Sequence, residues 1–136
     1  FVIVVADAGP ILHLHWIGCL SWGLPPTPIH VVEQVWSEIT QHAPQALDDP
    51  RLQREPVVDI DPRLQAKFSL QLGETAAIAF ALKHPASLLL TDDDAARRAC
   101  VSVGLAAVGT IGLILEAARS KRVPHEEARQ ALEHLP

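Results

Sequence analysis

The sequence of 136 residues is poor in features that would point to several classes of protein. Its two cysteines, Cys19 and Cys100, are too few for a zinc site built from cysteine thiolates. They leave open one disulfide, although we expect two buried thiols, as in a cytosolic protein. No apolar run approaches the about 20 residues that cross a bilayer, and the N-terminus lacks the layout of a signal peptide. We therefore expect a cytoplasmic protein with no membrane partner.

Positive charge is also scarce. Asp and Glu outnumber Lys and Arg by 16 to 11, so the net charge is −5 with neutral histidines. This balance argues against a protein that coats nucleic acid through bulk positive charge, but it allows an enzyme that meets phosphate through bound metal ions. Glycine-rich phosphate loops of the Walker or dinucleotide-binding type are absent as well. Because the composition is uniform and shows no repeat or linker, we treat residues 1–136 as a single domain.

Short apolar runs alternate with helical patterns along the chain. Strands are predicted at 1–6, 57–60, 88–90 and 105–108. Helices are predicted from Pro10 to Leu20, from Val31 onward, from 61 onward, from Gly73 to Lys83 with Pro85 as the stop, at 95–103, at 111–120 with Thr110 as N-cap, and from Pro124 as first helical residue to Leu135. Segments 21–29 and 42–56 indicate loops. This alternation is typical of an α/β fold with a parallel sheet buried on both faces.

Two of the predicted strands end in aspartate. Asp7 follows the first strand, and Asp92 and Asp93 follow the strand at 88–91. The carboxyl ends of strands in an open parallel sheet form its ligand crevice, so these side chains converge if their strands are neighbours. Glu74, in the first turn of its helix, and Glu38, beside the apolar stripe of its helix, are positioned to join them. We therefore expect the acidic positions to meet at one place.

A cluster of this kind is costly when it is empty. Two carboxylates about 4 Å apart repel each other by roughly 4 kcal/mol at an effective dielectric constant near 20, so protons or cations must relieve them. Oxygen ligands without a neighbouring His or Cys pattern favour Mg²⁺ or Mn²⁺ over zinc. Such an ion lowers the pKa of its bound water and screens a phosphate, which suits phosphodiester hydrolysis.

Each acid also has a simpler interpretation when it is taken alone. Asp7 can merely start a turn, and Glu38 can be a solvated helix residue. Glu74 can complement the helix dipole, an effect of about 0.3–1 kcal/mol. One aspartate of the run 92–94 is expected to N-cap the helix that follows. The spacing by itself therefore supports an acid-rich crevice more than it supports a two-metal nuclease.

Four segments resemble motifs of PIN-domain proteins, the toxin nucleases of VapBC-type toxin–antitoxin pairs. Val4–Leu12 resembles their opening strand and turn, and Val32–Ile39 resembles their second acidic motif. Leu72–Ala79 resembles the third motif, in which an acid opens an alanine-rich helix. Leu88–Arg97 and the segment 104–113 are similar to a VapC-like branch of short prokaryotic PIN proteins, formerly known only as a domain of unknown function.

The resemblance implies a three-layer α/β/α sandwich around a central parallel sheet, with an acidic pocket for Mg²⁺ or Mn²⁺ and endoribonuclease activity on RNA. It also implies a small antitoxin protein that blocks the pocket, and a homodimer. The catalytic positions it implies are Asp7, Glu38, Glu74 and Asp93, and the metal ligands are Asp7, Glu74, Asp92 and Asp93. Adjacent extended residues point to opposite faces, so Asp92 and Asp93 both line the pocket only if a turn begins there.

The chain departs from the family pattern after its first aspartate, where Ala8 and Gly9 replace the usual hydroxyl residues. This departure supports an alternative, a PIN-like binding or assembly module with weak or lost activity. Arg97 and Arg98 follow the aspartates within one helical turn and are candidates for contact with the substrate. A receiver-like phosphotransfer domain needs a lysine at a late strand end, and Val108–Thr110 offers none.

Overall fold

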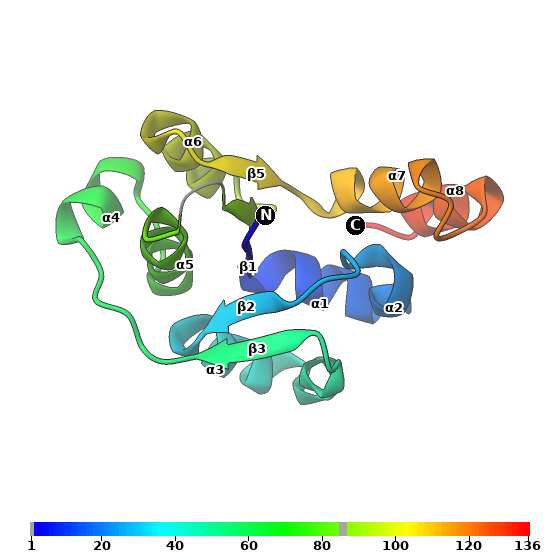
Figure 1. Cartoon of the computed structure of the whole chain (residues 1–136), viewed down its shortest axis with the longest axis horizontal. Coiled ribbons are helices and arrows are strands. Elements are labelled where there is room, and N and C mark those ends of the chain that lie inside the picture. Colours follow the sequence, from blue (N-terminus) through cyan, green and yellow to red (C-terminus); the bar gives the residue numbers. More distant parts are fainter. Residues whose placement is uncertain (1, 85–86) are drawn as a thin grey trace.

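A five-stranded sheet, in which every pairing is parallel, forms the centre of the computed structural model, which describes residues 2–84 and 87–136 (Figure 1). Its strands are β1 (Val4–Ala6), β2 (Ile29–Val32), β3 (Leu52–Glu55), β4 (Leu88–Leu90) and β5 (Ala106–Val108). The predicted α/β fold with a parallel sheet is confirmed.

The order of the strands places a crevice between β1 and β4. The sheet runs β3-β2-β1-β4-β5, so the chain builds outward from β1 to one edge and then returns to the other side of β1. Ligand crevices of open α/β sheets lie at such a switch point, outside the carboxyl ends of the strands. Ala6 is in register with Leu90, and the backbone N–H of Asp7 donates to the carbonyl of Leu90 at 2.8 Å. The residues that follow β1 and β4 therefore emerge side by side.

Two groups of helices enclose the sheet and complete three layers (Figure 1). One group consists of α1 (Ala8–Trp16), α2 (Leu20–Gly23), α3 (Glu33–His42), α7 (Thr110–Arg119) and α8 (His125–Glu133). The other consists of α4 (Pro62–Phe68), α5 (Leu72–Leu82) and α6 (Asp94–Val103). A short 3₁₀-helix, η1 (Pro44–Asp48), follows α3. Helices α3 and α5 come from different groups and contact each other, which matters for the site described below.

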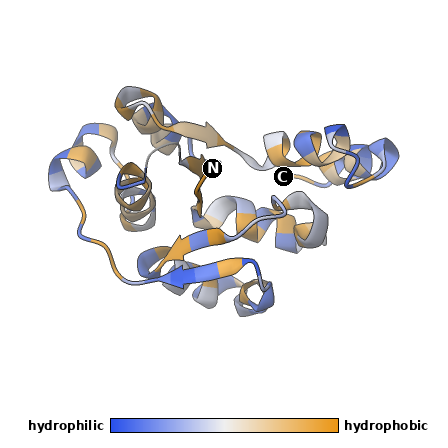
Figure 2. Cartoon of the chain, in the orientation of Figure 1, coloured by the Kyte–Doolittle hydropathy of each residue, from blue (hydrophilic) through white to orange (hydrophobic). Residues whose placement is uncertain are grey.

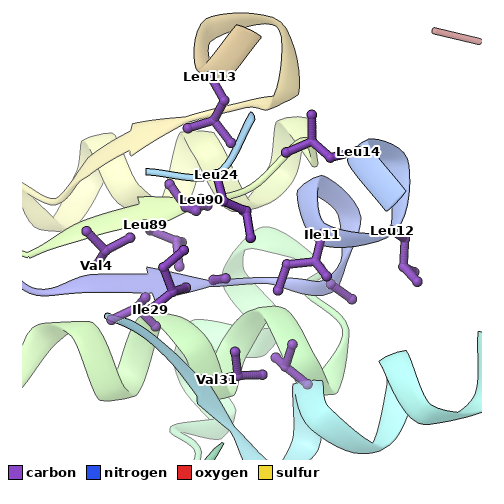
Figure 3. Packing of buried hydrophobic residues seen from close by; sticks show 14 of the residues in the cluster. Val4, Ile11, Leu12, Leu14, Leu24, Ile29, Val31, Leu89, Leu90 and Leu113 are labelled. Atoms are coloured by element: carbon purple, nitrogen blue, oxygen red, sulfur yellow. The ribbon is translucent and has the colours of Figure 1, made fainter. Parts of the chain in front are cut away.

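Aliphatic side chains from the central strands and the helices fill the space between the layers (Figure 3). Val5 and Leu89 lie in neighbouring strands, and both are fully buried. Ile11 and Leu14 of α1 are fully buried as well. Burial of aliphatic groups on both faces of the strands explains why β1 and β4 are continuous apolar runs.

The polar segment 42–56, predicted to be a loop, contains the edge strand β3. That prediction is wrong. Strand β3 lies at the edge of the sheet and pairs with β2, and because Leu52 is its only buried side chain, the segment lacks the apolar pattern of a strand. Its remaining side chains are hydrophilic (Figure 2), and two of them pair with His30 in β2 and with Glu33 at the start of α3. Glu55 lies 2.9 Å from His30, and Arg54 donates two hydrogen bonds of 2.7 Å to Glu33. An edge strand stabilised by such pairs has no apolar signature.

Three further boundaries differ from the predictions. The segment 29–32 forms β2, whereas a loop to residue 29 and a helix from Val31 were predicted. The helix begins later than predicted because Val32 ends the strand and is also the N-cap of α3. The apolar run 57–60 forms no strand, and Val57 is 67% exposed. The single helix predicted to Leu20 is two helices, separated near Gly18, whose φ is +74°. Gly18 breaks the helix because a left-handed φ costs glycine little.

Several smaller predictions complete the comparison. Pro124 is the N-cap of α8 and not its first helical residue. Phe1 in the first predicted strand and Pro85 as a helix stop lie outside the described residues. Cys19 and Cys100 are free and buried, as expected. None of the helices in the described ranges is long and apolar enough to span a membrane.

Replacing Leu89 in the central strand tests this core. We expect Leu89→Ala to lower the free energy of unfolding by about 2–5 kcal/mol, because it removes a fully buried side chain and leaves a cavity. Val101→Ala in α6 is the matched control, since Val101 is 81% exposed and its truncation is expected to change stability by no more than about 0.5 kcal/mol. Urea denaturation measures both, and equal losses would contradict the described packing.

Candidate acidic active site

Three acidic side chains lie at the N-termini of three helices. Asp7 ends β1 and N-caps α1, where its Oδ1 accepts a hydrogen bond from the N–H of Ala8 at 2.8 Å. Asp93 follows β4 and N-caps α6, and its Oδ1 accepts from the N–H of Ala95 at 3.0 Å. Glu74 lies in the first turn of α5, and its Oε2 accepts from the N–H of Gln71 at 3.2 Å. Each carboxyl group is thus oriented by a backbone N–H at the start of a helix, where these groups have no hydrogen-bond partner within the helix. The partial positive charge of this helix end favours an anion.

A buried threonine connects the ends of the two central strands. Thr91 directly follows β4 and is fully buried. Its Oγ1 donates a hydrogen bond to Oδ2 of Asp7 at 3.1 Å and accepts one from the N–H of Asp93 at 3.3 Å. The hydroxyl group of Thr91 therefore connects the carboxyl group of Asp7, after β1, to the backbone of Asp93, after β4.

The fourth acid, Glu38, arrives from α3 at the point where α3 meets α5. A side chain at Gly73 would meet Oε1 of Glu38 at 3.3 Å and Oδ1 of Asp7 at 3.9 Å. The two carboxyl groups therefore border the same small space, which stays open because residue 73 has no side chain. Glu38 was expected at the border of the buried face of its helix, and it is half-buried there.

The acids perturb one another. Burial raises the pKa of Asp7 to about 6, hydrogen bonds from Ala8 and Thr91 partly oppose this shift, and the charges of Glu38 and Asp93 add to it. Burial likewise raises the pKa of Glu74 to about 7, and the charges of Asp7 and Asp93 contribute. The structure therefore brings Asp7, Glu38, Glu74 and Asp93 into one electrostatic cluster, called the acid cluster below.

Asp92 makes a different set of contacts. Its carboxylate accepts hydrogen bonds from the N–H of Thr110 at 2.6 Å and from Oγ1 of Thr110 at 2.5 Å, and it lies 2.6 Å from Nδ1 of His13. Thr110 is accordingly not the predicted N-cap, because Gly109 occupies that position and Asp92 satisfies the start of α7 from another strand. A side chain at Gly109 would come within 2.7 Å of Oδ1 of Asp92, so glycine is needed for this approach.

The two arginines of α6 are both exposed, and they differ in their position relative to a neighbouring cavity. Arg97 borders a cavity of about 560 Å³ together with His13, Asp92 and Thr110. Arg98 is not among the residues that line this cavity. Arg97 is therefore the better placed of the two to contact a bound molecule near the acid cluster.

The donor set of the acid cluster fits a hard divalent cation. Its donors are carboxylate oxygens, which Mg²⁺ and Mn²⁺ prefer. Among the described residues, no group of three His, Cys, Asp or Glu side chains is already gathered closely enough to hold a metal ion. Mg²⁺ keeps several waters and needs only one or two carboxylates from a protein, so a fully gathered cage is not required. The raised pKa values of Asp7 and Glu74 are those expected of clustered carboxyl groups without a cation.

Sequence reasoning missed the supporting residues of the site. Thr91 was not predicted as part of the site, yet its hydroxyl contacts Asp7 directly. The available signal was a buried hydroxyl residue between an apolar strand and an acidic run. The open space at Gly73 and the contact between His13 and Asp92 had no signal, because each depends on segments far apart in the chain.

Comparison with known proteins gives one match. A family model described as a PIN domain matches residues 3–136, which is almost the whole chain. Searches of curated proteins and of solved structures find no match.

The titration of Asp7 gives a test by stability. In metal-free buffer we expect Asp7→Asn to raise the free energy of unfolding at pH 8 and to have little effect at pH 4. Folding raises the pKa of Asp7 from 3.8 to about 6, so the native state binds more protons than the unfolded chain within this window. Stability of the parent chain therefore falls as the pH rises through the window. A shift of this size corresponds to a gain of up to about 3 kcal/mol for the asparagine variant.

Urea denaturation in EDTA at a series of pH values measures this difference. Asn keeps the oxygen that accepts from Ala8, so the cap of α1 is preserved. Asp59→Asn is the matched control, because Asp59 is exposed and lies outside the acid cluster. A difference between the parent and Asp7→Asn that does not vary with pH would contradict the described burial of Asp7.

Proposed function

The chain belongs to the PIN-domain family, and on that premise we propose that it is a metal-dependent endoribonuclease that hydrolyses RNA phosphodiester bonds. PIN domains are in general nucleases that use divalent metal ions. The observation that carries the proposal is the convergence of Asp7, Glu38, Glu74 and Asp93 at the switch point of the sheet. We further propose that the enzyme is a cytoplasmic homodimer and the toxin of a type II toxin–antitoxin pair, blocked by a small antitoxin protein.

Each acid has a role in this proposal. Asp7, Glu74 and Asp93 would hold Mg²⁺ or Mn²⁺, because each is oriented by a backbone N–H through one oxygen and can offer a lone pair of the other oxygen to a cation. In Asp7 that other oxygen also accepts from Thr91. When bound, the ion would supply an activated water and screen the phosphate. Glu38 borders the same space from α3 and would accept a hydrogen bond from the attacking water. Asp92 supports the site by joining α1, β4 and α7.

The protonation of the cluster is coupled to its occupancy. Asp7 and Glu74, with pKa values of about 6 and about 7, are partly protonated near neutrality. Cation binding requires their ionised forms, so it releases protons and strengthens as the pH rises. Arg97 and Arg98 lie on α6 beyond the cluster, where they meet the phosphates of the RNA.

The alternative is a binding or assembly module with weak or lost activity, favoured by Ala8 and Gly9 in place of hydroxyl residues. Thr91 weakens this alternative, because it provides a hydroxyl that donates to Asp7 from the neighbouring strand. A side chain at Gly9 would face Asp92 at 3.6 Å, away from the contacts that Asp7 makes with Thr91. The missing hydroxyls therefore leave the acid cluster intact.

Cleavage of RNA tests the proposal. We expect the parent chain to cut single-stranded RNA internally in Mn²⁺ or Mg²⁺, and EDTA to abolish the cutting. Asp7→Asn is expected to lower kcat/KM by at least about 100-fold, because it removes the charge of a metal ligand. Glu127→Gln, on the exposed face of α8, is the matched control and should cut as the parent does. Cutting that persists in EDTA and in Asp7→Asn would refute the metal-dependent mechanism.

Thermal denaturation with Mn²⁺ separates the proposal from its alternative. An ion bound only by the native state stabilises it by about 2.7 kcal/mol at a concentration 100 times the Kd. We expect Mn²⁺ to raise the Tm of the parent and of Glu127→Gln, and to leave the Tm of Asp7→Asn almost unchanged. Equal Tm values for the parent with and without Mn²⁺ would favour the inactive binding module.

A further inference from the structure

A groove of about 510 Å³ lies beside the acid cluster, between α3 and the start of α5. Its wall on α3 is formed by Gln34, Ser37, Glu38 and Gln41. These residues recur at spacings of three and four, so they occupy one face of the helix. This groove is called the α3–α5 groove below.

The opposite wall brings the groove to the acid cluster. It includes Leu72 and Gly73 at the start of α5, together with Val57 from the segment after β3. Gly73 lies next to carboxylate oxygens of both Glu38 and Asp7. Glu38 therefore belongs both to the groove and to the acid cluster, and Gly73 lies between them. A molecule in the groove would lie next to a phosphate held at the acids.

The charge of the groove excludes a phosphate as its occupant. No Lys or Arg lines it within the part of the chain that the structure describes. Glu33 also borders it, but Arg54 neutralises that carboxylate through two hydrogen bonds of 2.7 Å. Gln34 is engaged with the backbone of Val58, to which its Nε2 donates at 2.7 Å. Apart from Glu38, which belongs to the acid cluster, the remaining polar side chains of the groove are the uncharged Ser37 and Gln41 and the exposed Gln71.

The remaining surface of the groove is apolar and open. Leu72 is 52% exposed and Val57 is 67% exposed, although both are aliphatic. Flat, uncharged groups with hydrogen-bonding edges match this combination, because an amide both donates and accepts hydrogen bonds. Unpaired bases of RNA have this chemistry, and proteins recognise them by contact with their faces and hydrogen bonds to their edges.

Resting on the proposed function, we propose that the α3–α5 groove is a nucleoside subsite for the unpaired nucleotide next to the bond that is cut. The base lies against Leu72 and Val57, and Gln41 and Gln71 hydrogen-bond to its edge. Arg97 lines the other cavity, with Asp92 and Thr110, so this cation for the backbone is separate from the groove for the base. The acid cluster borders the groove through Glu38, and Asp92, next to Asp93 in the chain, lines the cavity of Arg97.

Binding without cleavage tests the subsite. Four labelled single-stranded RNA octamers, each of one base, are titrated with the Glu38→Gln chain in Mg²⁺ and followed by fluorescence anisotropy. This variant keeps the three proposed metal ligands and lacks the carboxylate proposed to orient the water. Adding Gln41→Ala is expected to weaken binding of the preferred octamer by about 2- to 10-fold, the effect of one hydrogen bond, and to narrow the differences among the four bases. Adding Leu72→Ala is expected to weaken all four to a similar extent, because an apolar contact does not distinguish base edges.

Gln130→Ala is the matched control, because Gln130 is an exposed glutamine on α8, outside both cavities. Gln41 and Leu72 are exposed, so both variants are expected to keep the Tm of their parent. Sequencing the ends of cut RNA from Gln41→Ala in the active background should show a weaker base preference beside the cut. If the parent cuts RNA and both groove variants keep its affinity and base preference, the proposal of a nucleoside subsite is overturned, whereas the proposed ribonuclease function is supported. If the parent neither binds nor cuts RNA, both are overturned.

Discussion

Negative charge gathered at the carboxyl ends of β1 and β4 is the constraint on which the rest of this structure depends. Carboxyl groups in such proximity repel one another, and burial of Asp7 raises the cost further. The fold offsets this cost by starting three helices at the same place, so that backbone N–H groups donate to Asp7, Glu74 and Asp93. The remaining cost is met by protons, which the raised pKa values record, or by a divalent cation. A cluster whose repulsion costs stability is explained by function and not by stability.

The turn after β4 assigns different tasks to adjacent residues. Asp93 belongs to the acid cluster, and Thr91 donates a hydrogen bond to Asp7 in it. Asp92 points to the other side and accepts a hydrogen bond from the N–H of Thr110 at the start of α7. The same carboxylate lies beside His13, so the turn connects α1, β4 and α7. One short segment thus carries a ligand and also fixes the two helices that border it.

Charge is sorted around the cluster in a way that suits a single strand of RNA. Carboxylates occupy the centre, and Arg97 lies in the cavity beside Asp92. The α3–α5 groove adds amide and aliphatic side chains next to Glu38. A nucleotide has the same division into a charged backbone and an uncharged base. The net charge of −5 is compatible with the proposed function, in which a bound cation and not a lysine or arginine meets the phosphate.

The sequence by itself determined the strands that are continuous apolar runs. Apolar runs identified β1 and β4, and the acids that follow them identified the edge of the sheet where a ligand belongs. It did not determine β3, because an edge strand with one buried side chain is stabilised by cross-strand pairs that have no local pattern. Only the tertiary structure decided that Asp93 faces the cluster while Asp92 caps α7, since that choice depends on Thr110, which is 18 residues away in the chain. Local patterns report burial, whereas the direction of a polar side chain is set by partners that only the folded chain brings close.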